Sequence, residues 1–166
     1  MYRSDAPTSL DANSLRVGIV VSEYHHDITS ALCDGARQTF LDAGGVSSNL
    51  TIIAAPGSFE LVSIATRLAD TMDAVVTLGC IITGDTTHDQ YIGHAVAQGI
   101  AQISVLTGVP VGFGVLTCQT IDQARARAGG DKGNKGAETM AATIQTATVL
   151  RSLAAQEEGI TDVSAS

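Results

Sequence analysis

A histidine, two threonines and an aspartate stand together in the segment Gly84-Asp85-Thr86-Thr87-His88. Backbone N–H groups and hydroxyls at the start of a helix form a binding site for anions such as phosphate. A histidine side chain titrates near neutral pH and can carry protons. The types and spacing of these residues therefore indicate a phosphate site beside a proton-transferring group. An ordinary capped helix with a histidine in its first turn is the alternative interpretation.

The flanking sequence indicates how this segment is positioned. Residues 73–78 are apolar and rich in β-branched side chains, which predicts a buried strand. From residue 88 to residue 106, apolar residues recur at helical spacing, namely Ile92, Ala95, Val96, Gly99, Ile100 and Ile103. Residues 79–87 are thus predicted to form a strand-to-helix turn. Gly84 would permit an unusual backbone angle there, and Asp85 to Thr87 are N-cap residue types.

Composition and charge limit the class of protein and of ligand. The chain has 166 residues, 45% of them hydrophobic and 16% charged, which indicates one globular domain with its own core. A formal net charge of -8 argues against non-specific nucleic-acid binding. An anionic substrate would need local cations. Four of the nine Lys and Arg residues lie between positions 125 and 135, either as a solvated surface loop or as a phosphate-binding group: Arg125, Arg127, Lys132 and Lys135.

The cysteines and the first residues indicate the cellular compartment. Cys33, Cys80 and Cys118 are far apart and form no CxxC pair, which disfavours a disulfide framework and a zinc site. We expect them to be small buried side chains in a reducing compartment. No secretory signal is visible at the N-terminus, and no apolar run is long enough to span a bilayer. The sequence therefore predicts a cytoplasmic protein with no membrane partner.

The remaining chain alternates between strand and helix patterns. A loose arm is predicted at 1–14, one domain at 15–155 and a frayed tail at 156–166. Asp27 and Ser58 are the predicted N-caps of the first two helices. The predicted strands are 15–22, 50–54, 73–78 and 109–117, and the predicted helices are 27–43, 58–70, 88–106, 121–128 and 135–155, with a flexible glycine-rich loop at 129–134.

This alternation predicts an α/β fold with a parallel sheet, right-handed crossovers and helices on both faces. Ligands of such sheets bind beyond the carboxyl ends of the strands. Four loops would meet at that edge, at residues 22–26, 56–60, 80–88 and 113–117. The chain contains no GxGxxG or GxxxxGK[ST] motif, so nucleotide binding has little support.

Together, these loops resemble the lumazine synthase family. The resemblance covers residues 15–153 and rests on motifs that occur in the family's order: Gly18-Ile-Val-Val-Ser with its following aromatic, Ala55-Pro-Gly-Ser-Phe-Glu, Leu78-Gly-Cys-Ile-Ile-x-Gly-Asp-Thr-Thr-His, Phe113-Gly-Val-Leu-Thr, and Ala126-Arg-Ala-Gly followed by Asn134-Lys-Gly. It implies a three-layer αβα sandwich around a four-stranded, flavodoxin-like parallel sheet.

The resemblance also implies an activity, that of the penultimate enzyme of riboflavin biosynthesis. This transferase condenses 5-amino-6-ribitylaminouracil with 3,4-dihydroxy-2-butanone 4-phosphate to 6,7-dimethyl-8-ribityllumazine, releasing phosphate and water. The substrate amine is the nucleophile, so neither a metal nor an organic cofactor is needed. An archaeal-type riboflavin synthase, and a non-catalytic flavin-binding or shell-forming protein on the same fold, are the alternatives.

The same resemblance implies a catalytic or substrate-binding role for each matching position. His88 would be the proton shuttle and, with Arg127, the catalytic pair. The remaining substrate-binding positions would be the phosphate turn Gly84, Asp85, Thr86 and Thr87; the ring-stacking Tyr24; Ser58, Phe59 and Glu60 at the ribityl-bearing substrate; Cys80, Ile81 and Ile82 in the ring pocket; and Phe113 and Lys135 from a neighbouring subunit. Phe113 and Ile81 as core residues, and Glu60 as a helix-start charge, are the alternatives.

The chain departs from the family pattern in three places. Thr83 stands where a basic residue is usual, and Asp89-Gln90 replaces an aromatic and an acidic residue. His25-His26 follows Tyr24 where an asparagine is common. Adjacent histidines diverge on most backbones, so no metal site is expected there. These departures leave room for a changed substrate preference.

The resemblance finally implies assembly. Members of the family form pentamers in which the N-terminal arm adds a strand to a neighbour's sheet, and some pentamers close into icosahedral, 60-subunit shells. The linker 129–135 is short, which goes with shell formation, and Pro7 is compatible with an edge strand. We therefore expect at least a pentamer, a shell by preference, active sites shared between subunits, and riboflavin synthase as a candidate partner.

Overall fold

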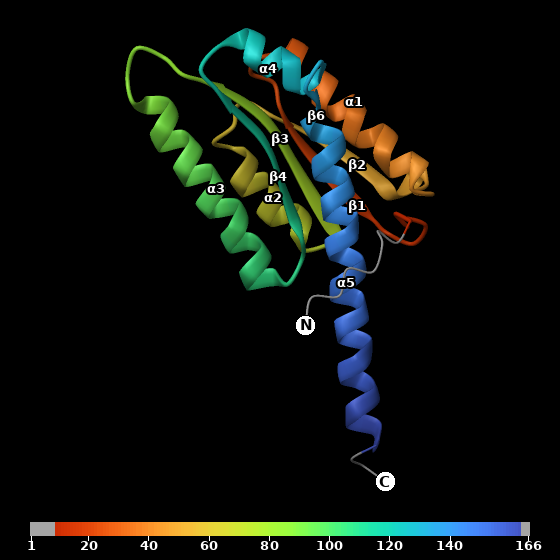
Figure 1. Ribbon diagram of the computed structural model, residues 1–166. Helices are drawn as coiled ribbons and strands as arrows, with labels where there is room; N and C mark the ends of the chain where they lie inside the picture. The colour runs from red at the N-terminus through yellow and green to blue at the C-terminus, as the bar shows by residue number, and fades with distance from the viewer. Residues whose placement is uncertain (1–8, 164–166) are drawn as a thin grey trace, which may run out of the picture.

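A four-stranded parallel sheet forms the centre of the computed structural model, which describes residues 9–163 (Figure 1). The strand order is β2-β1-β3-β4. The strands are β1 (Val17–Ser22), β2 (Leu50–Ala55), β3 (Ala74–Ile82) and β4 (Val111–Cys118). Every pair of neighbours is parallel, so the predicted α/β fold is confirmed.

Helices cover both faces of this sheet and divide the core into two layers (Figure 1). One layer lies under α1 (His26–Asp42), α4 (Ile121–Arg127) and α5 (Lys135–Val163). The other lies under α2 (Leu61–Ala69) and α3 (His88–Thr107). The three-layer αβα sandwich is therefore confirmed. None of the described helices combines the length and the hydropathy needed to cross a membrane.

The burial of each strand follows its position in the sheet. The central strands β1 and β3 are covered on both faces and read as nearly unbroken apolar runs, as parallel strands do. The edge strand β2 is less covered, with Ile52 43% and Ile53 37% exposed. β3 continues to Ile82, past the predicted end at residue 78, because residues 79–82 pair with residues 115–118 of β4. Four of the nine residues of the predicted strand-to-helix turn are therefore strand.

Both predicted N-caps are wrong. α1 begins at His26, after His25 in a left-handed conformation (φ 56), so Asp27 lies inside its first turn. There the Asp27 carboxylate pairs with Arg125 at 3.4 Å. α2 begins at Leu61, and its cap residue Glu60 makes no side-chain cap bond. A side chain of a cap-forming type can thus make a different contact, as Asp27 does with Arg125.

Two predictions about glycines also need correction. Gly84 is not among the residues with positive φ, so its predicted unusual backbone angle is wrong. The predicted flexible loop is instead an antiparallel hairpin of β5 (Ala128–Gly130) and β6 (Gly133–Asn134). Asn134 fixes this hairpin, because its Nδ2 donates to the Ala31 carbonyl at 2.9 Å and its Oδ1 accepts from the Ala137 N–H at 3.1 Å.

The two ends of the described chain differ from the expected loose arm and frayed tail. Leu10 and Ala12 pack on the core, and the Ala12 N–H donates to the Ala43 carbonyl at 2.8 Å. Residues 1–8, with Pro7, lie outside the described residues. At the other end α5 remains helical to Val163 and extends beyond the body of the domain (Figure 1). Leu150 on this helix is 39% exposed.

Candidate active site

A cavity of about 1040 Å³ opens at the carboxyl ends of the strands, where the sequence predicted a site. Three loops form it, following β1, β2 and β3. Its lining residues are Tyr24, His25, Ser58, Phe59, Glu60, Cys80, Ile81, Ile82, Thr83, Gly84, Thr86, His88, Asp89, Tyr91, Ile92 and Ala95. We call this space the main cavity.

The loop after β1 brings an aromatic side chain to the main cavity. Tyr24 is 67% exposed, and its ring meets that of His25 edge-on, with centroids 4.8 Å apart. The Tyr24 N–H donates to the Ser22 hydroxyl at 3.2 Å, which holds the loop against the end of the strand. His25 was not predicted as a site residue. Its left-handed backbone (φ 56) is uncommon for a non-glycine residue and is often found at functional sites.

The loop after β2 contributes a carboxylate and a second aromatic ring. Phe59 is 59% exposed and Glu60 is exposed, whereas Ser58 is buried against β3. A Cβ at Gly79 would lie 2.8 Å from the Ser58 hydroxyl oxygen, so the glycine permits this close approach. Tyr24 and Phe59 thus offer flat apolar surfaces next to a hydrogen-bond acceptor, an arrangement suited to a planar ring with a hydroxylated chain.

The end of β3 and the turn after it bring the titratable group. Thr86 accepts from the backbone N–H of His88 through its hydroxyl at 3.4 Å, and His88 is exposed to the cavity. Of the four predicted turn residues, Gly84 and Thr86 line the main cavity, while Asp85 and Thr87 do not. The imidazole is therefore free to exchange protons with a ligand.

Cys80 lies in the wall of the main cavity but does not offer a nucleophile. Burial, with smaller contributions from Cys118 and Asp27, raises the pKa of its thiol to about 12. At neutral pH the thiolate needed for attack is nearly absent. The arrangement thus suits proton transfer and non-covalent binding.

Sequence reasoning missed the part of α3 that faces the main cavity. Asp89, Tyr91, Ile92 and Ala95 line it together with His88. The spacing of residues 88, 91, 92 and 95, which places them on one helix face, could have identified three of these four. Asp89 also lines a second cavity of about 510 Å³, between α3 and β4.

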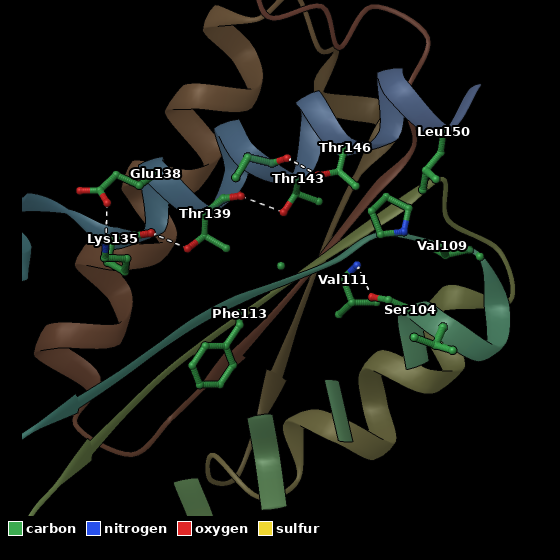
Figure 2. A pocket seen from close by; sticks show the side chains of 15 residues that line it. Ser104, Val109, Val111, Phe113, Lys135, Glu138, Thr139, Thr143, Thr146 and Leu150 are labelled. Carbon is green, nitrogen blue, oxygen red and sulfur yellow. Dashed lines mark hydrogen bonds and ion pairs between the residues drawn. The ribbon is translucent and has the colours of Figure 1, made fainter. Parts of the chain in front are cut away.

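Besides Asp85 and Thr87, three more of the predicted site residues are not brought to the main cavity. Phe113 is 41% exposed at the edge of the sheet and lines the second cavity and a third one. Lys135 lies in that third cavity, between α3, β4 and α5, where it pairs with Glu138 (Figure 2). Arg127 is exposed and donates to the Gln123 carbonyl at 3.0 Å.

The main cavity consequently lacks positive charge. Among the residues that the structure describes, no lysine or arginine lines it. In the same part of the chain, no group of three or more His, Cys, Asp or Glu side chains could hold a metal ion. One chain therefore provides ring-binding and proton-transferring groups, but it does not surround an anion with cations.

Comparison with known proteins identifies relatives along almost the whole chain. The family model described as 6,7-dimethyl-8-ribityllumazine synthase matches residues 14–151. The protein of that name from Kocuria rhizophila is 45% identical over 145 residues, which cover 86% of this chain and 92% of the relative. Its counterpart from Deinococcus radiodurans is 44% identical over 155 residues, covering 92% and 99%. The one from Pseudarthrobacter chlorophenolicus is 47% identical over 143 residues, covering 85% and 88%.

Proposed function

Because this chain belongs to the 6,7-dimethyl-8-ribityllumazine synthase family, we propose that it condenses 5-amino-6-ribitylaminouracil with 3,4-dihydroxy-2-butanone 4-phosphate in riboflavin biosynthesis. The product is 6,7-dimethyl-8-ribityllumazine, formed with release of phosphate and water. The observation that carries this proposal is the family match over residues 14–151, which includes all three loops of the main cavity. The riboflavin synthase and non-catalytic alternatives receive no support from the comparisons.

For this reaction the protein must align the two substrates and transfer protons. The substrate amine attacks the ketone of the four-carbon substrate, and the carbinolamine loses water before phosphate leaves. The second amine, which bears the ribityl chain, then closes the ring on the remaining carbonyl and a second water is released. His88, exposed at the main cavity, gives and takes the protons of these steps. Holding two substrates in one cavity converts an encounter in solution into a reaction between neighbours.

The ring-bearing substrate occupies the part of the cavity formed by the loops after β1 and β2. Tyr24 stacks on the pyrimidine, and the Glu60 carboxylate accepts from ribityl hydroxyls, with Ser58 and Phe59 beside it. Cys80, Ile81 and Ile82 form the apolar floor. The four-carbon substrate then lies next to Gly84, Thr86 and His88. Asp85 and Thr87 belong to the same phosphate-binding turn, although they do not line the cavity.

We further propose that a second copy of the chain completes the site, within a pentamer or a shell of pentamers. Arg127, Lys135 and Phe113 lie outside the main cavity of their own chain, and that cavity lacks the cation that a phosphate needs. A neighbour that presents these three residues supplies both the charge and the missing ring wall. The arm strand, a cytoplasmic location and the riboflavin synthase partner remain predictions from the sequence.

The surface of α3 supports such an assembly. Only Val96, Ile100 and Ile103 of this helix are buried, and it carries no Asp, Glu, Lys or Arg after its first turn. Tyr91, Val105 and Leu106 are 73%, 82% and 75% exposed. A long, uncharged and largely uncovered helix is suited to packing against other subunits.

The proposal is tested by incubating the purified protein with both substrates and following lumazine absorbance. Each substrate alone is the control. Formation of riboflavin from lumazine alone would favour the riboflavin synthase alternative, and absence of any turnover would favour the non-catalytic one. His88→Ala should slow lumazine formation by about 10²–10⁴-fold without abolishing it, since the amine stays reactive. His94→Ala is the matched control, because His94 lies on the same helix outside the main cavity.

A further inference from the structure

The aromatic ring of Tyr24 stands at the main cavity with little support from the core. Tyr24 is 67% exposed and, within residues 9–163, belongs to neither layer of the hydrophobic core. The bond from its N–H to the Ser22 hydroxyl holds the backbone but leaves the ring free to rotate about the side-chain bonds. A ring that must stack on a substrate therefore needs another contact to set its orientation.

His25 provides a ring contact of this kind. Its imidazole meets the Tyr24 ring with centroids 4.8 Å apart and planes inclined at 76°. Edge-on pairs of aromatic rings attract each other, because the positive edge of one ring faces the negative face of the other. Such a pair covers at most one face of the tyrosine, so the other face stays available to a planar ligand in the main cavity, which both residues line.

The backbone fixes where the His25 ring lies. The His25 carbonyl accepts from the N–H groups of Ile28 and Thr29 at 2.9 and 3.0 Å, which makes His25 the N-cap of α1. Its φ of 56 and ψ of 51 set the direction of its Cα–Cβ bond. The imidazole makes no capping hydrogen bond, so the helix start does not use this side chain. The anchored residue is thus His25, and the ring that it can hold is that of Tyr24.

We propose that His25 is a positioning residue, whose ring holds the Tyr24 ring in the orientation that stacks on the pyrimidine of ribitylaminouracil. This inference rests on the proposed function, from which it takes the stacking by Tyr24. A side chain that is already oriented loses less rotational freedom when the ligand binds. His25 therefore strengthens the binding of one substrate by acting on Tyr24.

The test compares wild type with His25→Asn and His25→Phe, each purified as the full chain. Asparagine removes the ring but tolerates the left-handed backbone, whereas phenylalanine keeps a ring edge and is strained there. His25→Asn should raise the KM for ribitylaminouracil about two- to tenfold and leave the KM for the butanone phosphate nearly unchanged. His25→Phe should keep both KM values close to those of wild type.

Thermal unfolding without ligand should rank the variants in the opposite order. His25→Asn should unfold at a temperature equal to or above that of wild type, and His25→Phe below it, because only the bulky ring is strained by the backbone. A merely structural role would make the less stable variant the weaker binder. His26→Asn is the matched control, since His26 is exposed at the same helix start and does not line the main cavity.

Near-ultraviolet circular dichroism measures the ring contact in the free protein. The chain has three tyrosines and no tryptophan, so tyrosine rings dominate this signal. His25→Asn should weaken the tyrosine band, because the Tyr24 ring then rotates freely, and His26→Asn should leave it unchanged. An unchanged band in His25→Asn would contradict the proposed orientation.

A double-mutant cycle separates positioning from direct contact with the substrate. In a Tyr24→Ala background, His25→Asn should not raise the KM for ribitylaminouracil further, because the ring that it orients is absent. A further rise of the same size would assign His25 to the substrate itself and overturn the inference. An unchanged KM in an active His25→Asn protein, or equal rises for both substrates, would also overturn it while the proposed function stands. A wild-type protein that forms no lumazine would remove the proposed function, and this inference with it.

Discussion

Asp73 and Arg151 meet at the amino-terminal end of the sheet, with Oδ1 of the carboxylate 3.4 Å from Nη2 of the guanidinium. The other oxygen, Oδ2, accepts from the backbone N–H of Arg16 at 2.7 Å and from its Nε at 3.3 Å. Arg151 also donates from Nη1 to the Ser14 hydroxyl at 2.9 Å. One carboxylate thus joins the segment before β1, the start of β3 and the last helix.

This contact predicts a loss of stability in acid. Burial raises the pKa of Asp73, but the hydrogen bonds and charge of Arg16, with the charge of Arg151, outweigh it and hold the pKa below its usual range. A lowered pKa in the folded state stabilises the fold above the unfolded pKa of about 4, and that stabilisation is lost as pH falls through the folded pKa. Asp73→Asn should lower the free energy of unfolding by about 1–2 kcal/mol at pH 7. The loss is no larger because both arginines are partly exposed, and water weakens their interaction with the carboxylate.

Denaturant unfolding of Asp73→Asn and wild type at several pH values measures this effect. The difference between the two should shrink as pH falls below about 4. Asp70→Asn is the control, since its pair with Arg67 is on the surface, with side chains 51% and 84% exposed. A difference that is independent of pH would contradict the explanation.

A second prediction concerns the contact between α1 and α5. A Cβ at Gly136 would lie 1.9 Å from the carbonyl oxygen of Leu32, so Gly136→Ala must push the two helices apart. Overpacking of this kind costs about 1–3 kcal/mol, against a gain in helix propensity of up to about 1 kcal/mol. Gly84→Ala is the control for stability, because a Cβ there meets nothing within 4 Å. Equal unfolding free energies of the two variants would refute the close contact.

A third prediction tests the role of Arg127 in phosphate binding. Its side chain is exposed and, within residues 9–163, hydrogen-bonds only to the Gln123 carbonyl, so Arg127→Ala should leave thermal unfolding nearly unchanged. Loss of a charge-assisted hydrogen bond should cost about 1.5–3 kcal/mol of binding. The KM for butanone phosphate should therefore rise far more than the KM for ribitylaminouracil. Arg67→Ala, on α2, is the charge-matched control.

A fourth prediction concerns the shared site. Light scattering of the diluted protein should give the mass of a pentamer or a larger assembly. Mixing His88→Ala with Lys135→Ala subunits should give more activity than either variant alone, since some sites would then combine an intact main cavity with an intact neighbour. Unmixed variants at the same total concentration are the control. A fully active monomer would rule out sharing.

The sequence was sufficient for the fold because hydrophobic periodicity decides it. An apolar run marked β3, and the helical spacing of Val96, Ile100 and Ile103 marked the buried face of α3, both of which are confirmed. The carboxyl-end rule then located the main cavity. Its walls contain most of the residues predicted from the loops after β1, β2 and β3, because those loops lie side by side in any sheet of this order.

What could not be predicted depends on contacts between distant segments. Asn134 looks like a loop residue until Ala31 is known to lie beside it and to accept a hydrogen bond from its side chain. The prediction of Asp27 as an N-cap was wrong because His25 adopts a left-handed conformation and the helix begins directly after it. The residue type of a histidine does not predict such a conformation. That Oδ1 of Asp89 is buried without a hydrogen-bond partner among residues 9–163 is visible only once the surrounding atoms are in place.

Among the described residues no lysine or arginine lines the main cavity, and this affects how fast an anionic substrate associates. A phosphate ester approaching an isolated chain of net charge -8 meets a repulsive potential and no local attraction. Its association rate constant would then rise with added salt, since screening weakens the repulsion. If a neighbour's cations complete the mouth of the cavity, capture becomes electrostatically steered and the salt dependence changes sign. Stopped-flow association with a phosphate-bearing ligand, recorded across ionic strength, would therefore report on the charge that the arriving anion meets.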